Sequence, residues 1–274
     1  MDHFIAVIFK TNEEQTAMLT ALLMDAGFEG VEEGENETRV FISENSFNQT
    51  LTTEIFSQFE LTYTTEKIAQ QNWNATWESS FEPVQVDDFA AIRASFHAPV
   101  SNVEHDIIIT PKMSFGTGHH ATTFLMVQEM RLLPFQDKSV IDSGTGTGVL
   151  AILAEMLGAK DIIAIDYDEW SIDNAKENID ANHCSKLVLV KADTMIAGAK
   201  ADIILANINL NVIVANMPLI TETCNNDSLV LFSGLLVHDE KVMRSVLEAN
   251  GLHILKIVSR NNWIAILARL AVAG

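Results

Sequence analysis

The chain has 274 residues, of which 48% are apolar and 20% are charged. This length favours two domains, and the composition is that of a folded protein and not of a disordered one. The formal net charge of −20 disfavours DNA or RNA as the primary ligand, and no apolar run reaches the roughly 18 residues needed to cross a bilayer. We therefore expect a cytoplasmic protein in which the widely spaced Cys184 and Cys224 are buried, reduced thiols.

Residues 1–65 are predicted to form a small α+β domain. The expected elements are strands at 4–9, 28–32, 38–43 and 61–65, a first helix between Thr11 and Gly27, and a second helix at 48–58. Thr11 is positioned to cap the first helix. Its apolar face is expected to consist of Met18, Leu19, Leu22 and Leu23. The order strand, helix, strand, strand, helix, strand is that of a ferredoxin-like unit.

The residues at 66–82 have a polar, helical pattern and are interpreted as a linker. Trp73 and Trp77 lie one helical turn apart there and are expected to pack between domains. A larger second domain is predicted at 83–274. After a strand-rich stretch at 84–109, it has strand patterns at 139–141, 161–165, 187–190, 203–206 and 229–232, with helical patterns between them. Such alternation predicts a parallel sheet covered by helices.

The last two expected strands, 253–259 and 263–269, are separated only by Arg260, Asn261 and Asn262. So short a connection forms an antiparallel hairpin and not a crossover. A doubly wound sheet that ends in a hairpin departs from the nicotinamide-binding Rossmann fold. The predicted fold class is therefore α/β, with the Rossmann-like sheet of class I methyltransferases that use S-adenosylmethionine (SAM), and a smaller ferredoxin-like α+β domain before it.

The segment Asp142–Gly148 (DSGTGTG) lies between a strand pattern and a helix pattern that begins at Val149. Glycines let the backbone turn tightly and approach a ligand closely. Val149 stands where a dinucleotide fingerprint has its third glycine, which disfavours a nicotinamide cofactor. Gly144 and Gly146 are therefore predicted to bind SAM. The Asp142 carboxylate is predicted to face the amine of the methionine moiety, directly or through water.

Two acids follow the next two expected strands. Asp166 lies 22 residues beyond Gly144 and ends the strand at 161–165, where the ribose hydroxyls of an adenosine would bind. Asp193 follows the strand at 187–190 and is a candidate acceptor for the adenine amino group. The alternative interpretation of each is a solvated loop acid.

Residues 114–123 (SFGTGHHATT) are rich in glycine and hydroxyl groups and precede an apolar helix pattern at 124–132. Thr122 or Thr123 is positioned to cap this helix. The density of small polar groups also fits a cover over the cofactor. Adjacent histidines point in different directions and have no third ligand nearby, so we expect no metal site here.

Together these segments resemble the PrmA-type methyltransferases, which modify protein eleven of the large ribosomal subunit. The resemblance is carried by residues 115–123, by the glycine turn with Val149–Ile152 after it, and by Ala206–Ile208. The segments 73–77, 81–84 and 233–236 are also similar to the family. The resemblance covers roughly residues 73–270, whereas residues 1–65 match only in the order of their elements.

The resemblance implies that Thr123, Gly144, Asp166 and Asn207 contact SAM. It also implies methyl transfer to amino groups, on lysine side chains or the α-amine, of that ribosomal protein. Residues 1–65 would recognise the ribosomal protein, which we expect to be modified while it is free, before assembly. We expect no direct contact with nucleic acid or membrane.

Asn207 ends the fourth parallel strand and is predicted to be the catalytic residue, whose amide oxygen orients the incoming amine. A cap for the helix that follows is the alternative role. The run Asn207–Leu210 (NINL) lacks the prolines and the aromatic ring of the NPPY motif of enzymes that methylate nucleobases or glutamine amides, which favours a tetrahedral amine. A methyltransferase for those planar amines, or a SAM-binding regulator without catalysis, are the alternative functions.

Overall fold

The computed structural model describes residues 3–34, 37–69, 81–112, 115–196 and 198–271. The chain divides into two compact units, Met1–Phe81 and Glu82–Gly274. Trp73 and Trp77 lie outside the described residues, as does most of the segment that was interpreted as a linker. Within the described part of the chain, no helix is long and apolar enough to cross a membrane.

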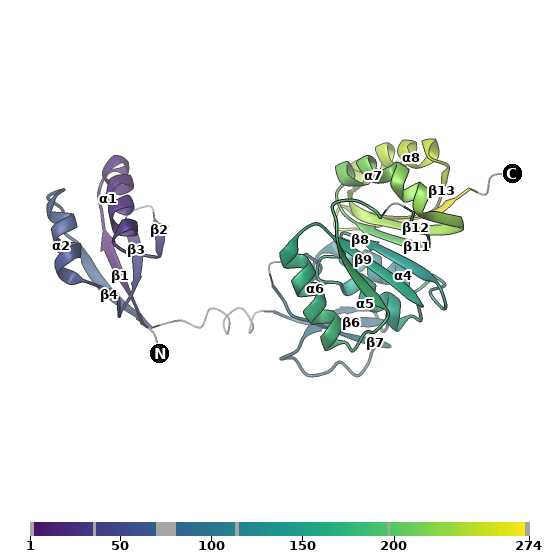
Figure 1. Cartoon of the computed structure of the whole chain (residues 1–274), viewed down its shortest axis with the longest axis horizontal. Coiled ribbons are helices and arrows are strands. Elements are labelled where there is room, and N and C mark those ends of the chain that lie inside the picture. Colours follow the sequence, from purple (N-terminus) through teal and green to yellow (C-terminus); the bar gives the residue numbers. More distant parts are fainter. Residues whose placement is uncertain (1–2, 35–36, 70–80, 113–114, 197, 272–274) are drawn as a thin grey trace. The chain divides into compact units, whose positions relative to one another are not determined.

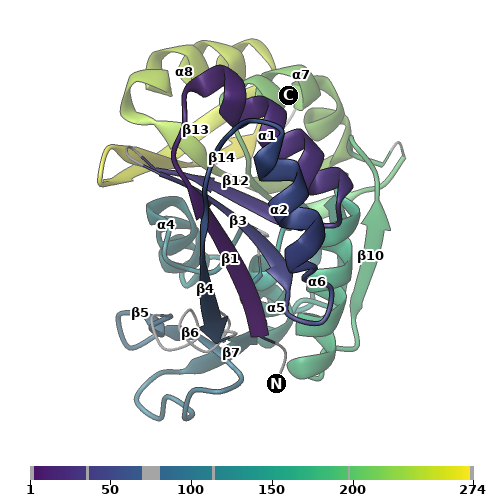
Figure 2. The ribbon, with the colours of Figure 1, turned by 90° about the vertical axis from the view of Figure 1, so that its left-hand side faces the viewer.

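The first unit contains a four-stranded antiparallel sheet with the order β2-β3-β1-β4 among its described residues. Its strands are β1 (His3–Phe9), β2 (Gly30–Glu33), β3 (Thr38–Ser43) and β4 (Thr64–Ala69). Helices α1 (Glu13–Asp25) and α2 (Gln49–Ser57) lie side by side on one face of this sheet (Figure 2). The order of elements confirms the predicted ferredoxin-like unit.

The core of the first unit lies between its helices and its sheet. Leu19 and Leu23 of α1 and Phe56 of α2 are buried in it, against alternate residues of β1 and β3. Met18 and Leu22 are exposed, so the predicted apolar face of α1 was too broad. The reason is that α1 packs against other elements on one side only, so the stripe of residues that becomes buried is narrower than the predicted apolar face.

The cap of α1 and the bounds of β4 differ from the prediction. The cap of α1 is Asn12 and not Thr11, because the Asn12 side chain accepts a hydrogen bond from Gln15 N at 2.9 Å. Strand β4 begins at Thr64 and includes residues 66–69, which were predicted to be helical. These residues pair antiparallel with β1, and this pairing satisfies the hydrogen-bonding groups of their main chain. Their polar local pattern gave no sign of this distant partner strand.

The second unit is built on a seven-stranded sheet with the order β10-β9-β8-β11-β12-β14-β13 among the described residues. Its strands are β8 (Ser139–Ser143), β9 (Asp161–Asp166), β10 (Leu187–Lys191), β11 (Ala201–Asn207), β12 (Cys224–Leu236), β13 (Leu252–Arg260) and β14 (Trp263–Leu270). The first five run parallel, and β14 inserts antiparallel between β12 and β13. This arrangement confirms the predicted class I methyltransferase sheet with its terminal hairpin.

Helices cover both faces of this sheet (Figure 1). Helices α4 (Ala121–Met130), α5 (Val149–Met156) and α6 (Glu169–Ala181) pack on one face, and α7 (Leu210–Thr223) and α8 (Glu240–Ala249) pack on the other. A short 3-10 turn, Val237–Asp239, precedes α8. Met217 of α7 and Leu247 of α8 share one core with Phe232 of β12. The sheet is therefore enclosed along its length and accessible at its strand ends.

A separate three-stranded sheet precedes α4 in the chain. It consists of β5 (Val84–Val86), β6 (Ala90–Ala94) and β7 (His105–Ile109), with β6 parallel to β7. A partly buried ion pair joins the two parallel strands, since the Arg93 guanidinium lies 2.8 Å from an Asp106 carboxylate oxygen. Strand β7 leads into the segment that was predicted to cover the cofactor.

Two asparagines, Asn178 in α6 and Asn182 at the C-terminal cap of this helix, bind main-chain groups of other segments. Asn182 accepts a hydrogen bond from Ile108 N at 2.9 Å and donates one to Ile108 O at 2.6 Å. The buried Asn178 accepts from Thr110 N at 2.6 Å and donates to Thr147 O at 2.8 Å. Side-chain amides thus supply the hydrogen bonds that a neighbouring strand would otherwise supply to Ile108 and Thr110. Through its two bonds, Asn178 links both the end of β7 and the glycine turn to α6.

We predict that Asn178→Ala lowers the free energy of unfolding by about 2 to 4 kcal/mol, because it leaves Thr110 N–H and Thr147 C=O buried without this partner. Urea denaturation measures the change. Asn211→Ala, which alters an exposed asparagine of α7, is the matched control and is expected to change stability by less than about 0.5 kcal/mol. Equal effects of the two substitutions would contradict the role assigned to Asn178.

Candidate functional site

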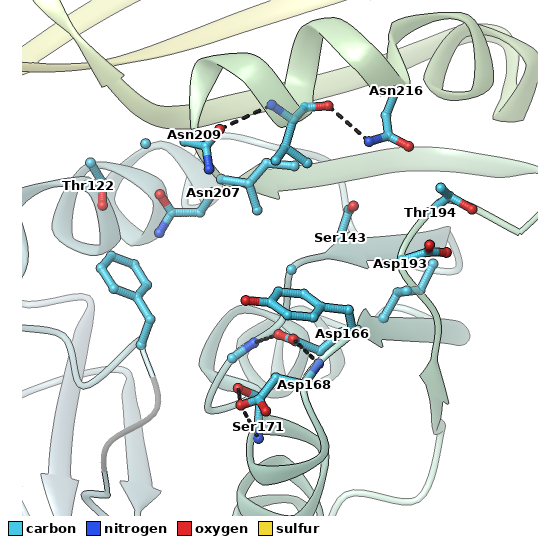
Figure 3. A pocket seen from close by; sticks show the side chains of 18 of the residues that line it. Thr122, Ser143, Asp166, Asp168, Ser171, Asp193, Thr194, Asn207, Asn209 and Asn216 are labelled. Carbon is cyan, nitrogen blue, oxygen red and sulfur yellow. Dashed lines mark hydrogen bonds between the residues drawn. The ribbon is translucent and has the colours of Figure 1, made fainter.

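A cavity of about 570 Å³ opens at the carboxyl ends of the parallel strands of the second unit. Ligands of doubly wound sheets bind at this edge. Figure 3 shows Asp166 and Asp168 on one side of the cavity and Asn207 and Thr122 across from them. The cavity therefore has two chemically different sides, one with carboxylates and one with amide and hydroxyl groups.

The glycine turn after β8 forms part of the cavity. The amides of Gly144 and Thr145 both donate to Ile165 O at 2.9 Å, which ties the turn to the end of β9. Gly144 and Gly146 have positive φ angles of 73° and 54°. A Cβ on Gly146 would lie 2.2 Å from the carbonyl oxygen of Phe115. This turn therefore requires glycine both for its conformation and for the close approach of another segment.

Asp166 is oriented by main-chain donors. Its two carboxylate oxygens accept hydrogen bonds from Gly146 N at 2.9 Å and from Asp168 N at 3.1 Å. The side chain is almost completely buried yet lines the cavity. An ionised carboxylate has about four acceptor sites, so Asp166 keeps capacity for the two hydroxyls of a ribose. The adjacent Tyr167 exposes most of its ring beside it. These features fit an adenosine-containing cofactor.

Asp142 does not line the cavity, and its side chain is completely buried. Its contact with a ligand amine, directly or through water, stays a prediction, and one of its oxygens, Oδ1, is buried without a hydrogen-bond partner among the described residues. Thr145 Oγ1 donates to one Asp142 oxygen at 2.6 Å. The pKa of Asp142 is raised to about 7, mainly by burial; the Thr145 bond opposes this rise, and the charge of Asp166 adds to it. The carboxyl group thus supports the glycine turn from beneath.

The segment before α4 contributes a histidine and a threonine to the cavity. His120 caps α4, since its Nδ1 lies 3.4 Å from Thr122 N and 2.8 Å from Thr122 Oγ1. Thr122 and Thr123 lie within the first helical turn, so neither is the cap that the sequence predicted. Thr122 lines the cavity, whereas Thr123 does not. The hydroxyl of Thr123 is buried and has no hydrogen-bond partner among the described residues.

Asn207 stands at the end of β11 and lines the cavity. Its neighbour Asn209 caps α7, because the Asn209 side chain accepts from Val212 N at 3.1 Å. The alternative role of Asn207 as that cap is therefore excluded. The amide oxygen of Asn207 is buried and has no hydrogen-bond partner among the described residues. A buried acceptor of this kind is costly unless a ligand satisfies it.

Several lining residues were missed from the sequence. Tyr167 directly follows Asp166, and this position was the signal that could have identified it. Phe115 and Trp263 also line the cavity, but Trp263 comes from the distant hairpin and carries no local signal. Asp193, the candidate acceptor for adenine, lines the cavity with an exposed side chain. No set of three potential metal ligands is found among the described residues.

Comparison with known proteins gives consistent matches. The family described as "Ribosomal protein L11 methyltransferase (PrmA)" matches residues 8–271. A ribosomal protein L11 methyltransferase of Bacteroides thetaiotaomicron is 37% identical over 257 residues, which cover 91% of this chain and 92% of the relative. Its namesake in Chlorobaculum tepidum is 34% identical and covers 96% of this chain, with 95% of the relative matched. The family match thus extends into the first unit, beyond the resemblance seen at roughly residues 73–270.

A solved structure with a corresponding name also resembles this chain. The crystal structure of ribosomal protein L11 methylase from Lactobacillus delbrueckii subsp. bulgaricus superposes with a TM-score of 0.65 at 27% sequence identity. The match covers 70% of this chain and all of that one. The fold and the sequence therefore point to the same group of enzymes.

We predict that Gly146→Ala weakens SAM binding at least about tenfold, or about 1.4 kcal/mol, because the added Cβ displaces the carbonyl of Phe115. Calorimetric titration with SAM measures the effect. Gly198→Ala is the matched control: Gly198 also has a positive φ, of 79°, but a Cβ there meets nothing within 4 Å. If both variants bound SAM like the parent protein, the close approach at Gly146 would not matter for the cofactor.

The buried Asp142 predicts a pH dependence of stability. Its pKa is raised from 3.8 to about 7, so the folded state favours the neutral carboxyl. The stability from this group is fully present below pH 3.8 and is lost as the pH rises through 7. Between about pH 5 and 7 the parent protein should lose up to about 1.4 kcal/mol per pH unit relative to Asp142→Asn. Parallel pH profiles in urea denaturation would contradict this expectation.

Proposed function

The chain belongs to the ribosomal protein L11 methyltransferase (PrmA) family, and we propose that it transfers methyl groups from SAM to amino groups of ribosomal protein L11, the eleventh protein of the large subunit. The observation that carries this proposal is the family match at 8–271, which includes both units. The net charge of −20 also favours a basic protein surface as the partner over a nucleic acid. We place the reaction in the cytoplasm, on the free protein before assembly.

The first unit is proposed to recognise L11. Helix α1 exposes Met18 and Leu22, two apolar side chains that lie one helical turn apart on the same side of the helix. Exposed apolar side chains close together are typical of protein interaction sites, and methionines adapt to partners of varied shape. A contact surface on this unit leaves the cavity of the second unit available for the reacting amine.

We propose that Gly144, Gly146 and Asp166 hold the cofactor, with Asp166 accepting from the ribose hydroxyls. The resemblance to the family adds Thr123 to these cofactor-binding residues. Its neighbour Thr122 is the threonine that lines the cavity. Bound SAM supplies the methyl group on a sulfonium centre that needs no further activation. The protein therefore acts by aligning the acceptor amine with that centre and by keeping water out.

Asn207 is proposed to orient the acceptor amine through its buried amide oxygen. The amine must be neutral to attack, and an amide oxygen accepts a hydrogen bond from a neutral amine without adding a negative charge. The position of Asn207 across the cavity from Asp166 separates the acceptor from the ribose-binding carboxylate (Figure 3). The hydrogen bond fixes the nitrogen lone pair toward the cofactor.

The substrate is tested by incubating the purified protein with labelled SAM and recombinant L11 from the same organism. We expect label in L11, and mass increments of whole methyl groups located on lysine side chains or the α-amine. The same incubation with total RNA and with assembled large subunits provides the comparison. Label in RNA and none in L11 would overturn the proposed substrate, and SAM binding without any acceptor would overturn catalysis.

We predict that Asn207→Ala lowers kcat roughly 10- to 100-fold and weakens SAM binding by a smaller factor, because orientation of the amine and one expected cofactor contact are lost while the ribose contacts of Asp166 remain. Steady-state kinetics and calorimetry separate these effects. Asn216→Ala is the control, since Asn216 lines the same cavity but donates to Val212 O of its own helix. Full turnover by Asn207→Ala would show that the orienting role is wrong.

A further inference from the structure

The connection between β11 and α7 passes directly over Gly234 of β12. A Cβ on Gly234 would lie 2.3 Å from the carbonyl oxygen of Ile208, 2.7 Å from its carbonyl carbon and 3.0 Å from its amide nitrogen. All three atoms belong to the main chain, which cannot turn aside as the end of a flexible side chain can. Gly234 also has a positive φ angle of 80°. This position therefore requires glycine both for its conformation and for the close approach of Ile208.

Gly234 belongs to an irregular part of β12. The pairing of β12 with β14 shifts its register after Phe232 and resumes at Leu235, so Ser233 and Gly234 stand opposite a single residue of β14. One extra residue of this kind forms a β-bulge, which bends a strand locally and often lies next to an active site. The hydroxyl of Ser233, whose side chain is completely buried, donates to Ile264 O at 2.8 Å. This hydrogen bond holds the bulge in place beneath the connection.

The connection itself is short and fixed at both ends. Asn207 is the last residue of β11 and pairs with Ser233 in the parallel ladder. Asn209 caps α7 through its side chain (Figure 3). Between them, the side chain of Ile208 lies against the glycine turn, since a Cβ on Gly144 would come within 2.3 Å of Ile208 Cγ2. Ile208 thus contacts the glycine turn through its side chain and the bulge through its main chain.

We propose that Gly234 is a positioning residue for methyl transfer, which acts through the main chain of Ile208 to hold the Asn207 amide in place. This inference rests on the proposed function, because it requires Asn207 to orient the acceptor amine. Gly234 has no side chain that could bind the amine itself. A side chain at this position pushes the Ile208 main chain away from β12, and so short a connection transmits the movement to Asn207. A displacement of about 1 Å in an orienting group can lower a rate by up to about 100-fold.

The first test locates Asn207 and requires no methyl acceptor. Crystal structures of the parent protein and of Gly234→Ala are compared, both with bound S-adenosylhomocysteine. We expect the amide oxygen of Asn207 to move by at least about 0.5 Å, which exceeds the tolerance of a productive site, while the Asp166 carboxylate stays in place. Gly251→Ala is the matched control, because Gly251 also has a positive φ, of 73°, but a Cβ there meets nothing within 4 Å. An unmoved Asn207 in Gly234→Ala would overturn the proposal.

The second test is a double-mutant cycle in which kcat is measured with L11. Gly234→Ala should lower kcat roughly tenfold when Asn207 is present, because the amide no longer meets the amine correctly. In the Asn207→Ala background it should lower kcat by less than about twofold, because no side chain remains to be positioned. Gly251→Ala should leave kcat unchanged in both backgrounds. Gly234 also lines the cavity, so a Cβ that merely obstructed the substrate would lower kcat equally in both backgrounds, and that result would contradict the positioning role.

Ser233→Ala provides a second variant that adds no atom to the site. It removes the hydrogen bond to Ile264 O that holds the bulge, so it should lower kcat in the presence of Asn207 and have no further effect in the Asn207→Ala background. Calorimetric titration with SAM shows whether each variant is folded. If Gly234→Ala does not fold, the cycle with Ser233→Ala decides, and equal losses in both backgrounds count against the proposal. Absence of any methylation of L11 would contradict the proposed substrate and leave the displacement of Asn207 to decide on Gly234.

Discussion

Thr147 connects three segments that the second unit needs to form its site. Its amide donates to Phe115 O at 2.9 Å, its hydroxyl donates to Gly116 O at 2.8 Å, and its carbonyl accepts from Asn178 at 2.8 Å. The side chain is completely buried, so breaking any of these bonds leaves polar groups without a partner and without access to water. The glycine turn, the segment before α4 and helix α6 are therefore positioned as one assembly around this residue.

This connection makes the two sides of the cavity depend on each other. The main chain of Phe115 packs against Gly146 in the glycine turn, while its ring contacts His120 and lines the cavity. A change to the Phe115 backbone thus alters the cofactor side and the acceptor side together. A change confined to its side chain alters the acceptor side alone.

The features that depend on a local pattern could be predicted from the sequence. The features that depend on a contact with a distant part of the chain could not. The strands of the main sheet, and the positions of Gly146 and Asp166 at their ends, follow from short-range alternation and spacing. The role of Asn178, whose side chain makes two hydrogen bonds to other segments, was not predictable, because its partner Thr110 is 68 positions away in the chain. In the sequence, Asn178 has the appearance of a solvated residue on a polar helix. Likewise, the sequence did not reveal that the terminal hairpin brings Trp263 to the cavity.

The placement of charge in the cavity follows from the chemistry of a neutral nucleophile. A carboxylate beside the acceptor amine would stabilise its ammonium form and raise its pKa, so the proton that must leave would be held more tightly. The chain has 37 acidic residues, yet the carboxylates that line the cavity follow β9 and β10 and do not come from the α4 segment or β14. Asn207 supplies an uncharged hydrogen-bond acceptor instead. An acceptor side built from amide and aromatic groups can therefore receive a charged product and still allow the amine to lose its proton for another transfer.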